Sequence, residues 1–276
     1  MSNIFFLFGR HPELSLAELM ARLPNASLVH SGAEGAVLNN PETLSESFFD
    51  QLGGSQKMIE LIESVDVNDV VQSLADQLEA IYRGNKLDYG LSVYGLPEAQ
   101  LRPWLLALKK ELRLRELKGR FINNQFRNIS AAQYKSIKEK GIELAVVYWG
   151  QRYWVGKVTG VQNIDAYAIR DYEKPFRDMK MGMLPPKLAQ MLINLTGVDG
   201  VVWDPFCGSG TVLMEGLLMG HAMVGSDLNP RHVDGALQNV DWIRDGDDRL
   251  PCPIFVHDAT HPIPDILLMP SPAKLI

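Results

Sequence analysis

The sequence predicts an α/β protein in two parts: an N-terminal α+β region over residues 1–165 and a Rossmann-like, doubly wound α/β domain over residues 188–276. Two observations favour this division. Short apolar runs typical of buried parallel strands alternate with helical patterns after residue 200. A stretch rich in proline, glycine and mixed charge occupies residues 166–187, and we predict that it is the linker between the two parts.

Apolar periodicity defines the elements of the N-terminal region in order. We expect strands at 4–9, 57–65, 88–95 and 120–123, a strand pair at 142–150 and 152–161, and helices at 12–23, 67–82, 98–118 and 130–141. Ser130 is a typical N-cap for the last of these helices, and Gly141 is a typical residue at its end.

The C-terminal domain begins with a helix, because Pro185 and Pro186 suit a helix start and the apolar pattern of 187–195 continues it. Buried parallel strands are then predicted at 201–203, 221–227, 252–258 and 265–269, with helices at about 210–219 and 230–244. In such a sheet a ligand binds beyond the carboxyl ends of the strands. The turns that follow the strands are therefore the first place to look for a site.

Composition excludes several classes of protein. The 276 residues are 46% apolar, which can supply a large core, and they contain no run of 18 apolar residues and no signal-peptide pattern. A cytoplasmic protein without a membrane partner is the expectation. The cysteines, Cys207 and Cys252, show no paired motif, so neither a disulfide framework nor a metal site is indicated. No feature sets an oligomeric state.

Charge is distributed unevenly along the chain. Lys plus Arg against Asp plus Glu number 5 against 14 in residues 1–100, 18 against 8 in 101–190, and 4 against 11 in 191–276. A basic block within an acidic protein is typical of a surface that contacts nucleic-acid phosphates, although a solvated helix face gives the same pattern. The candidate phosphate contacts are Lys109, Lys110, Arg113, Arg115, Lys118, Arg120 and Arg127.

The strongest motif is WDPFCGSGTVLMEG at 203–216, where the first C-terminal strand turns into its helix. Gly208 and Gly210 permit a sharp turn and a close approach of the backbone to a ligand. Asp227 ends the second strand 19 residues after Gly208, a spacing at which a carboxylate takes a ribose hydroxyl. Asp258 ends the third strand, so three successive strands end in an acid.

The same residues favour one nucleoside ligand over another. A dinucleotide motif requires a third glycine where this chain has Leu213, and Asp204 would repel a diphosphate. S-Adenosylmethionine has a primary ammonium that Asp204 would attract, together with a ribose and an adenine, and it has no phosphate. The sequence therefore predicts the methyl donor as the cofactor. A nicotinamide dehydrogenase is a distant alternative.

The residues also carry a family resemblance. The segments MKMGMLPPKLAQMLINL, DPFCGSGTVLMEG and GSDLNPRHVDGALQN resemble the class I amino-methyltransferase domain of THUMP-containing RNA methyltransferases. Within that family the chain is most similar to tRNA guanosine-N2 methyltransferases acting at position 10 and to the related K/L-like large-subunit rRNA methyltransferases. FGRHPELSLAEL, RNISAAQYKSIKEKG and VTGVQNIDAYAIRDYEKPFRD resemble the N-terminal and THUMP regions of the same family. The resemblance covers nearly the whole chain.

The resemblance implies an RNA-binding THUMP module that presents a base of structured RNA, above all tRNA, to a donor-binding domain. It implies that Asp204, Gly208, Ser209, Gly210 and Thr211 surround the methionine part of the donor and that Asp227 contacts the ribose. Leu228 and Asn229 are implied at the adenine edge, and Asp258 with Ala259 at the adenine amine. Met183, Leu184 and Pro185 match a segment that lies over the donor, and Phe206 is a further candidate contact to the cofactor. The expected reaction is methyl transfer to the exocyclic N2 of a guanosine in tRNA or rRNA.

The chain departs from the family pattern after the fourth predicted strand. Amino-methyltransferases have there an Asp/Asn-Pro-Pro-Tyr/Phe tetrapeptide, which orients the acceptor amine and stacks on the extruded base. This chain has Pro270, Ser271, Pro272 and Ala273 instead, so no catalytic residue is assigned and the methyltransferase domain is expected to be incomplete. An RNA-binding module without catalysis and a DNA amino-methyltransferase remain as alternatives.

Overall fold

The computed structural model describes residues 2–138, 140–178, 182–198 and 200–262, and its chain divides into two compact units. The N-terminal unit comprises most of the chain up to Asn163. The C-terminal unit comprises the chain from Ile164 onward together with two short earlier pieces, Ala17–Arg22 and Gln51–Gly54. Each unit contains its own sheet, and the mixed α/β class expected from the sequence is confirmed.

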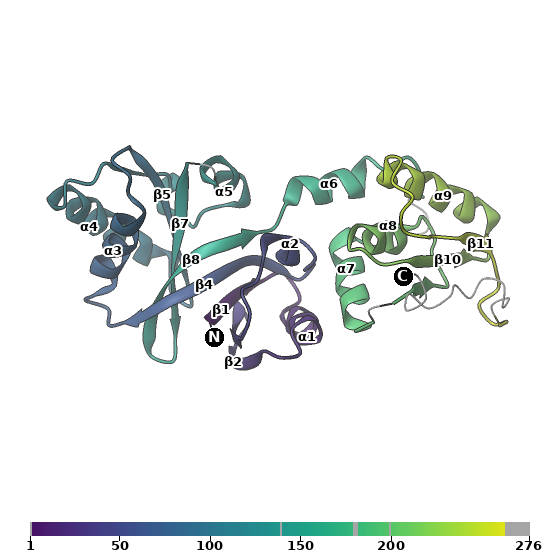
Figure 1. Cartoon of the computed structure of the whole chain (residues 1–276), viewed down its shortest axis with the longest axis horizontal. Helices are drawn as coiled ribbons and strands as arrows, with labels where there is room; N and C mark the ends of the chain where they lie inside the picture. Colours follow the sequence, from purple (N-terminus) through teal and green to yellow (C-terminus); the bar gives the residue numbers. More distant parts are fainter. Residues whose placement is uncertain (1, 139, 179–181, 199, 263–276) are drawn as a thin grey trace. The chain divides into compact units, whose positions relative to one another are not determined.

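The N-terminal unit is built on one eight-stranded sheet of order β2-β3-β1-β4-β8-β7-β5-β6. Its strands are β1 (Ser2–Phe8), β2 (Ser27–Ser31), β3 (Gly35–Asn40), β4 (Ser55–Val65), β5 (Leu87–Tyr94), β6 (Gly119–Phe121), β7 (Gly141–Trp149) and β8 (Arg152–Val161). The long strands β4 and β8 pair antiparallel at the centre, whereas β5 pairs in parallel with β6 and β7 (Figure 1).

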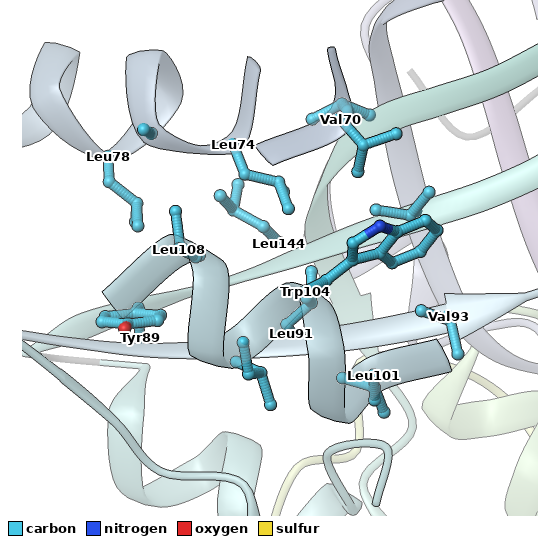
Figure 2. Packing of buried hydrophobic residues seen from close by; sticks show 14 of the residues in the cluster. Val70, Leu74, Leu78, Tyr89, Leu91, Val93, Leu101, Trp104, Leu108 and Leu144 are labelled. Atoms are coloured by element: carbon cyan, nitrogen blue, oxygen red, sulfur yellow. The ribbon is translucent and has the colours of Figure 1, made fainter. Parts of the chain in front are cut away.

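The helices of this unit are α1 (Pro12–Arg22), α2 (Glu46–Phe49), α3 (Val70–Ile81), α4 (Leu101–Leu114) and α5 (Ala131–Ile137), with short 3₁₀ turns at Glu98–Gln100 and Asn124–Phe126. Apolar residues recur along α3 and α4 at intervals of three and four, so each helix presents one apolar face. These faces pack with residues of β5 and β7 into one core; Figure 2 shows Leu74 and Leu78 of α3 near Leu108 of α4.

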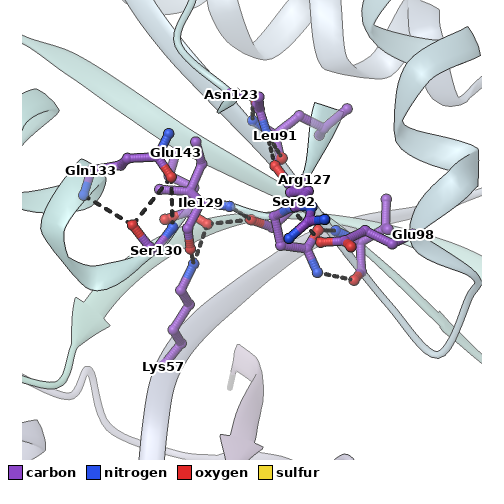
Figure 3. A network of polar contacts seen from close by, with 12 residues as sticks. Lys57, Leu91, Ser92, Glu98, Asn123, Arg127, Ile129, Ser130, Gln133 and Glu143 are labelled. Carbon is purple, nitrogen blue, oxygen red and sulfur yellow. Dashed lines mark hydrogen bonds and ion pairs between the residues drawn. The ribbon is translucent and has the colours of Figure 1, made fainter. Parts of the chain in front are cut away.

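A buried polar network crosses the middle of the sheet (Figure 3). The Lys57 ammonium on β4 donates to Glu143 Oε1 on β7 at 2.5 Å and to the Ile129 carbonyl at 2.7 Å. The Ser92 hydroxyl on β5 donates to the same Glu143 oxygen at 2.5 Å. Burial raises the pKa of Glu143 and lowers that of Lys57, while the opposite charge of each partner counteracts the shift. The network joins three strands that are far apart in sequence.

The C-terminal unit holds a three-stranded parallel sheet of order β11-β10-β9. The strands are β9 (Val202–Asp204), β10 (Met223–Asp227) and β11 (Ile254–Val256), and the helices are α6 (Ile164–Tyr172), α7 (Pro186–Leu195), α8 (Thr211–Leu218) and α9 (Pro230–Arg244). Leu213 and Met214 of α8 pack with Met223 of β10 and with Ala236 and Val240 of α9. The parallel pattern predicted after residue 200 is thus confirmed for the described strands.

Several predicted elements need correction. Residues 166–187, predicted to be the linker between the two parts, contain most of α6, which was not predicted; its Arg170 reaches a buried carboxylate of α8 that the local pattern does not reveal. β2, β3 and α2 were not predicted; β2 is exposed along its whole length and shows no alternation, whereas β3 is largely buried. Gly141 begins β7 rather than ending a helix. The predicted strand at 265–269 and the segment 270–273 lie outside the described residues.

No helix in the described part of the chain combines the length and apolarity that a bilayer span requires.

Candidate functional site

The glycine turn, residues 205–210, connects β9 to α8 in the C-terminal unit. Gly208 and Gly210 have φ values of 51° and 78°, in the left-handed region that disfavours side chains. A Cβ on Gly210 would lie 3.1 Å from the Cβ of Ala236 on α9, tighter than an ordinary contact. Both glycines are therefore required by the backbone path, as the sequence predicts.

Asp227, the last residue of the neighbouring strand β10, is hydrogen-bonded to this turn. Its Oδ2 accepts a hydrogen bond from the Gly208 amide at 3.0 Å, and its Oδ1 accepts one from the Asn229 amide at 2.9 Å. His232 Nδ1 lies 3.3 Å from the same Oδ1. An ionised carboxylate accepts about four hydrogen bonds, so these three contacts leave about one acceptor direction, on Oδ2, for a ligand's hydroxyl group.

Asp204 ends β9 on the strand beside β10, where it pairs in register with Gly225. Its Oδ1 accepts a hydrogen bond from the Phe206 amide at 3.1 Å. Burial raises the pKa of Asp204, the Phe206 hydrogen bond lowers it, and the nearby charge of Asp227 raises it further. Two carboxylates near each other in a partly buried place favour a cation, because a positive group would relieve their repulsion. An ammonium is the ligand group that this electrostatic environment suits.

Asp258 follows β11, the third strand of the sheet. The His257 amide donates to the Asp227 carbonyl at 3.1 Å, which extends the pairing of β10 and β11 up to the residue before Asp258. Asp258 Oδ1 accepts hydrogen bonds from the Thr260 amide at 3.0 Å and hydroxyl at 2.7 Å, and these bonds lower the pKa of Asp258. The three acids therefore follow three adjacent strands at the same edge of the sheet.

Two large apolar side chains beside these acids are exposed. Phe206 has an exposed fraction of 76% and Leu228 one of 70%, and they lie two positions after Asp204 and one position after Asp227. Neither belongs to the hydrophobic core around the glycine turn. Apolar side chains at a polar strand edge are suited to contact the flat face of a heteroaromatic ligand.

Other predicted ligand residues have structural partners of their own. Asn229 is the N-cap of α9, where its Oδ1 accepts from the Arg231 amide at 3.0 Å. Thr211 Oγ1 accepts from the buried Lys174 ammonium at 2.9 Å, and Ser209 is buried. Met183 is half-buried before α7, and Pro185 is the N-cap of that helix. Contacts of these residues with a ligand, like that of Ala259, stay predictions.

Cys207 lies buried within the turn, and burial raises the pKa of its thiol to about 12. We expect iodoacetamide at about pH 8 to leave Cys207 unmodified in the native protein, because the thiolate is the reactive form. Peptide mass spectrometry measures the modification, and the denatured chain, which should be labelled at Cys207, serves as the control. Rapid labelling of native Cys207 would contradict this assignment.

The basic block of the N-terminal unit separates into two groups. Arg115 contacts the carboxylates of Asp76 and Glu79 at 2.7 Å and Glu111 at 3.0 Å, and Arg120 pairs with Asp88. These two arginines have structural partners. Lys109, Lys110, Arg113, Lys118 and Arg127 are exposed, and Lys109 lies 5.8 Å from the centre of the Phe121 ring.

Sequence reasoning missed two buried polar side chains on the helices α8 and α9. Glu215 on α8 accepts from Arg170 Nε at 2.6 Å and from Nη2 at 3.0 Å, and it is fully buried. Asn239 on α9 is also fully buried and bonds to the Ser209 carbonyl. A polar residue on the inner face of an amphipathic helix was the available signal, since Asn239 follows Ala236 by three positions.

Comparison with known proteins finds a likeness to methyltransferases in the part of the chain that holds the glycine turn. Residues 175–247 match the model of a family described as the RMKL-like methyltransferase domain. This segment is therefore similar to that methyltransferase domain. The match includes the glycine turn, Asp204 and Asp227, and it ends before Asp258.

Two curated relatives resemble part of the chain. A tRNA (guanine(10)-N2)-dimethyltransferase of Methanothermobacter thermautotrophicus is 41% identical over 73 residues, which is 26% of this chain and 21% of the relative. Another protein so named, from Pyrococcus abyssi, is 31% identical over 97 residues, which is 35% of this chain and 29% of the relative. The matched segments thus span less than a third of these relatives.

The likeness in fold extends beyond residues 175–247. The structure of TrmN from Thermus thermophilus matches with a TM-score of 0.55 and 15% identity, covering 95% of this chain and 74% of that one. At this identity the match shows the fold alone. It does so for nearly all of the chain, in agreement with the fold class that the sequence predicts.

Proposed function

We propose that the C-terminal unit binds S-adenosylmethionine at the glycine turn. Asp204 attracts the donor's ammonium, Asp227 accepts a hydrogen bond from a ribose hydroxyl, and the turn from Gly208 to Thr211 surrounds the methionine part. Leu228 and Asn229 contact the adenine edge, and Asp258 accepts from its amine. The observation that carries the proposal is the proximity of the Asp204 and Asp227 carboxylates beside a turn whose Gly208 amide is already held by Asp227.

The donor site serves methyl transfer to an exocyclic amine of RNA, and we infer the N2 of a guanosine in tRNA as the acceptor. The match of residues 175–247 to the methyltransferase-domain model and the names of the curated relatives support this choice. The N-terminal unit is the RNA-binding part in this proposal, as its THUMP-like sequence implies. In this proposal the protein acts in the cytoplasm.

Isothermal titration with S-adenosylmethionine, S-adenosylhomocysteine and NAD tests the donor assignment. We expect both sulfur ligands to bind and NAD to fail, because its diphosphate would meet Asp204. Binding of NAD in preference to the methyl donor would overturn the proposal. Adenosine alone should bind more weakly than S-adenosylhomocysteine, because it lacks the methionine part.

A methylation assay separates the enzyme from a binding module. Transfer of a labelled methyl group to unmodified tRNA, located by nuclease digestion and mass spectrometry, would assign catalysis to this chain although Pro270, Ser271, Pro272 and Ala273 stand where the family has its tetrapeptide. Binding of tRNA together with the donor but without transfer would favour the noncatalytic alternative. Duplex DNA as the preferred acceptor would favour a DNA amino-methyltransferase.

Replacing Lys109, Lys110 and Arg113 together by alanine is expected to weaken tRNA binding and to lower its salt dependence. Each lost phosphate contact should reduce the slope of log affinity against log salt concentration by about 1. Fluorescence anisotropy with labelled tRNA at several salt concentrations measures both quantities. The paired substitution Arg10→Ala and Arg249→Ala, at exposed cations outside the basic block, is the control. An equal loss in the control would remove these three residues from the RNA contact.

A further inference from the structure

Asn239 joins the glycine turn to a segment that precedes α7. Its Nδ2 donates to the Ser209 carbonyl at 2.8 Å and to the Phe176 carbonyl at 2.9 Å, and its Oδ1 accepts from the Phe176 amide at 2.8 Å. The side chain is fully buried and uses both donor hydrogens. A single amide on α9 therefore connects the turn with residue 176, which lies 33 positions before Ser209.

The segment Lys174–Asp178, called the clasp below, is held against α8 and α9 by further contacts. Lys174 is buried and donates to Thr211 Oγ1 at the start of α8. The Phe176 ring lies on Gly235 of α9, where an added Cβ would stand 2.2 Å from a ring carbon. The Arg231 guanidinium lies 6.0 Å from the centre of that ring. The clasp thus touches both helices that flank the turn.

The helix α6, which precedes the clasp, also contacts α8. Arg170 and Lys174 are four residues apart, as are their partners Glu215 and Thr211, so two contacts repeat at the spacing of one helical turn. Burial lowers the pKa of Lys174, an effect that the charge of Asp171 partly counteracts. Burial also raises the pKa of Glu215, and the hydrogen bond and charge of Arg170 partly counteract it. These groups fix the clasp against α8, and Asn239 fixes it against the turn.

From this geometry we infer that Asn239 is a positioning residue for the donor, acting through the Ser209 carbonyl. The inference rests on the proposed function. The clasp and Asn239 set the path of Ser209 and Gly210, and these residues face the methionine part of the donor. Asn239 itself is fully buried, and it acts through its hydrogen bond to the Ser209 backbone carbonyl. Displacement of the turn by a fraction of an ångström would misplace the methionine site and leave the ribose site at Asp227 in position.

Asn239→Asp is the most specific test, because it keeps the shape and replaces two N–H donors with a carboxylate facing two carbonyls. We expect the Kd for S-adenosylhomocysteine to rise about 10- to 100-fold and the Kd for adenosine to change less than about threefold. The matched control is Gln238→Glu, the same change of charge on the exposed neighbouring residue. Equal losses for both ligands would overturn the inference.

A pH series gives a second readout that general destabilisation would not produce. Burial raises the pKa of the carboxyl group that Asn239→Asp introduces, and the protonated form of this group can donate one hydrogen bond to a carbonyl again. The ratio of the variant's Kd to that of the wild type should therefore shrink as the pH falls from about 8 to about 6. A ratio independent of pH would contradict the hydrogen-bond account.

Hydrogen exchange without any ligand keeps the inference separate from the proposed function. Amide exchange in residues 207–211 should be faster in Asn239→Asp than in Gln238→Glu, with little change in the core strand β10. If the wild type binds no methyl donor, the proposed function fails while this result still tests the support of the turn. Uniform acceleration throughout the C-terminal unit would show a structural role only.

Gly235→Ala provides an independent variant, since it displaces the Phe176 ring and leaves the Asn239 side chain intact. Alanine favours a helix more than glycine does, so helix stability alone predicts no loss. We expect a loss of S-adenosylhomocysteine affinity smaller than that of Asn239→Asp, with adenosine affinity retained. Unchanged affinity for S-adenosylhomocysteine would remove the clasp from the inference.

Discussion

Replacing Asp227 by alanine is expected to raise the Kd for S-adenosylmethionine at least about 100-fold. The carboxylate would lose its hydrogen bond to the ribose, and a bond to a charged group contributes about 1.5–3 kcal/mol. The substitution would also release the amides of Gly208 and Asn229, which the carboxylate holds at 3.0 and 2.9 Å. Isothermal titration measures the affinity, and the midpoint of thermal unfolding shows how far the fold is affected.

Two further substitutions make the Asp227 result specific. Asp234→Ala removes an exposed carboxylate from α9 and should change the donor Kd less than about twofold, because surface charges contribute little. Asp227→Asn keeps one acceptor oxygen and should give an intermediate loss. A change smaller than about threefold in Asp227→Ala would exclude Asp227 from the donor site.

Lys57→Met is expected to lower the free energy of unfolding of the N-terminal unit by about 3–5 kcal/mol, because it leaves the Glu143 carboxylate buried without its charged partner. The pair is 2.5 Å apart, and side-chain exposure is 5% for Lys57 and 0% for Glu143. Burial already raises the pKa of Glu143, so loss of the ammonium favours its protonation. Denaturant unfolding followed by circular dichroism, with hydrogen exchange in β4 and β7, measures the change.

The exposed pair of Lys138 and Glu46 provides the comparison. Lys138→Met should cost less than about 1 kcal/mol, because both side chains remain near water and screening weakens their attraction. The double variant Lys57→Met/Glu143→Leu should be more stable than Lys57→Met alone, since no unpaired buried charge remains. If Lys57→Met and Lys138→Met have equal free energies of unfolding, the buried pair contributes no more to stability than the exposed pair.

Much of the architecture could be predicted because local signals specify it. The apolar spacing of α3 and α4 gave both helices, although α4 ends at Leu114 and not at residue 118 as expected. Ser130 caps α5 as expected, and Gln133 completes a reciprocal capping box. The exposed strand β2 and the helix α6 were missed, because contacts with distant parts of their units stabilise them and their own residue patterns do not.

The candidate site likewise has some features that the sequence predicts and others that only the fold reveals. The glycine turn and the acids at the strand ends could be located from sequence, because left-handed backbone and strand termini leave local signatures. The partners of Arg115 could not, since Asp76 lies 39 positions earlier in the chain and Arg115 in a basic run resembles a free cation. That arginine belongs to the packing of α3 against α4 as much as to any phosphate surface.

The sequence by itself determined the glycine turn of the candidate site: two glycines with positive φ, an acid before them and an acid 19 residues after Gly208. Only the tertiary structure decided what holds that turn in place. Asn239 reaches Ser209 across 30 positions and Phe176 across 63, and Lys57 reaches Glu143 across 86. Backbone conformation is a property of neighbouring residues, whereas a buried hydrogen bond exists only after folding has brought distant residues together.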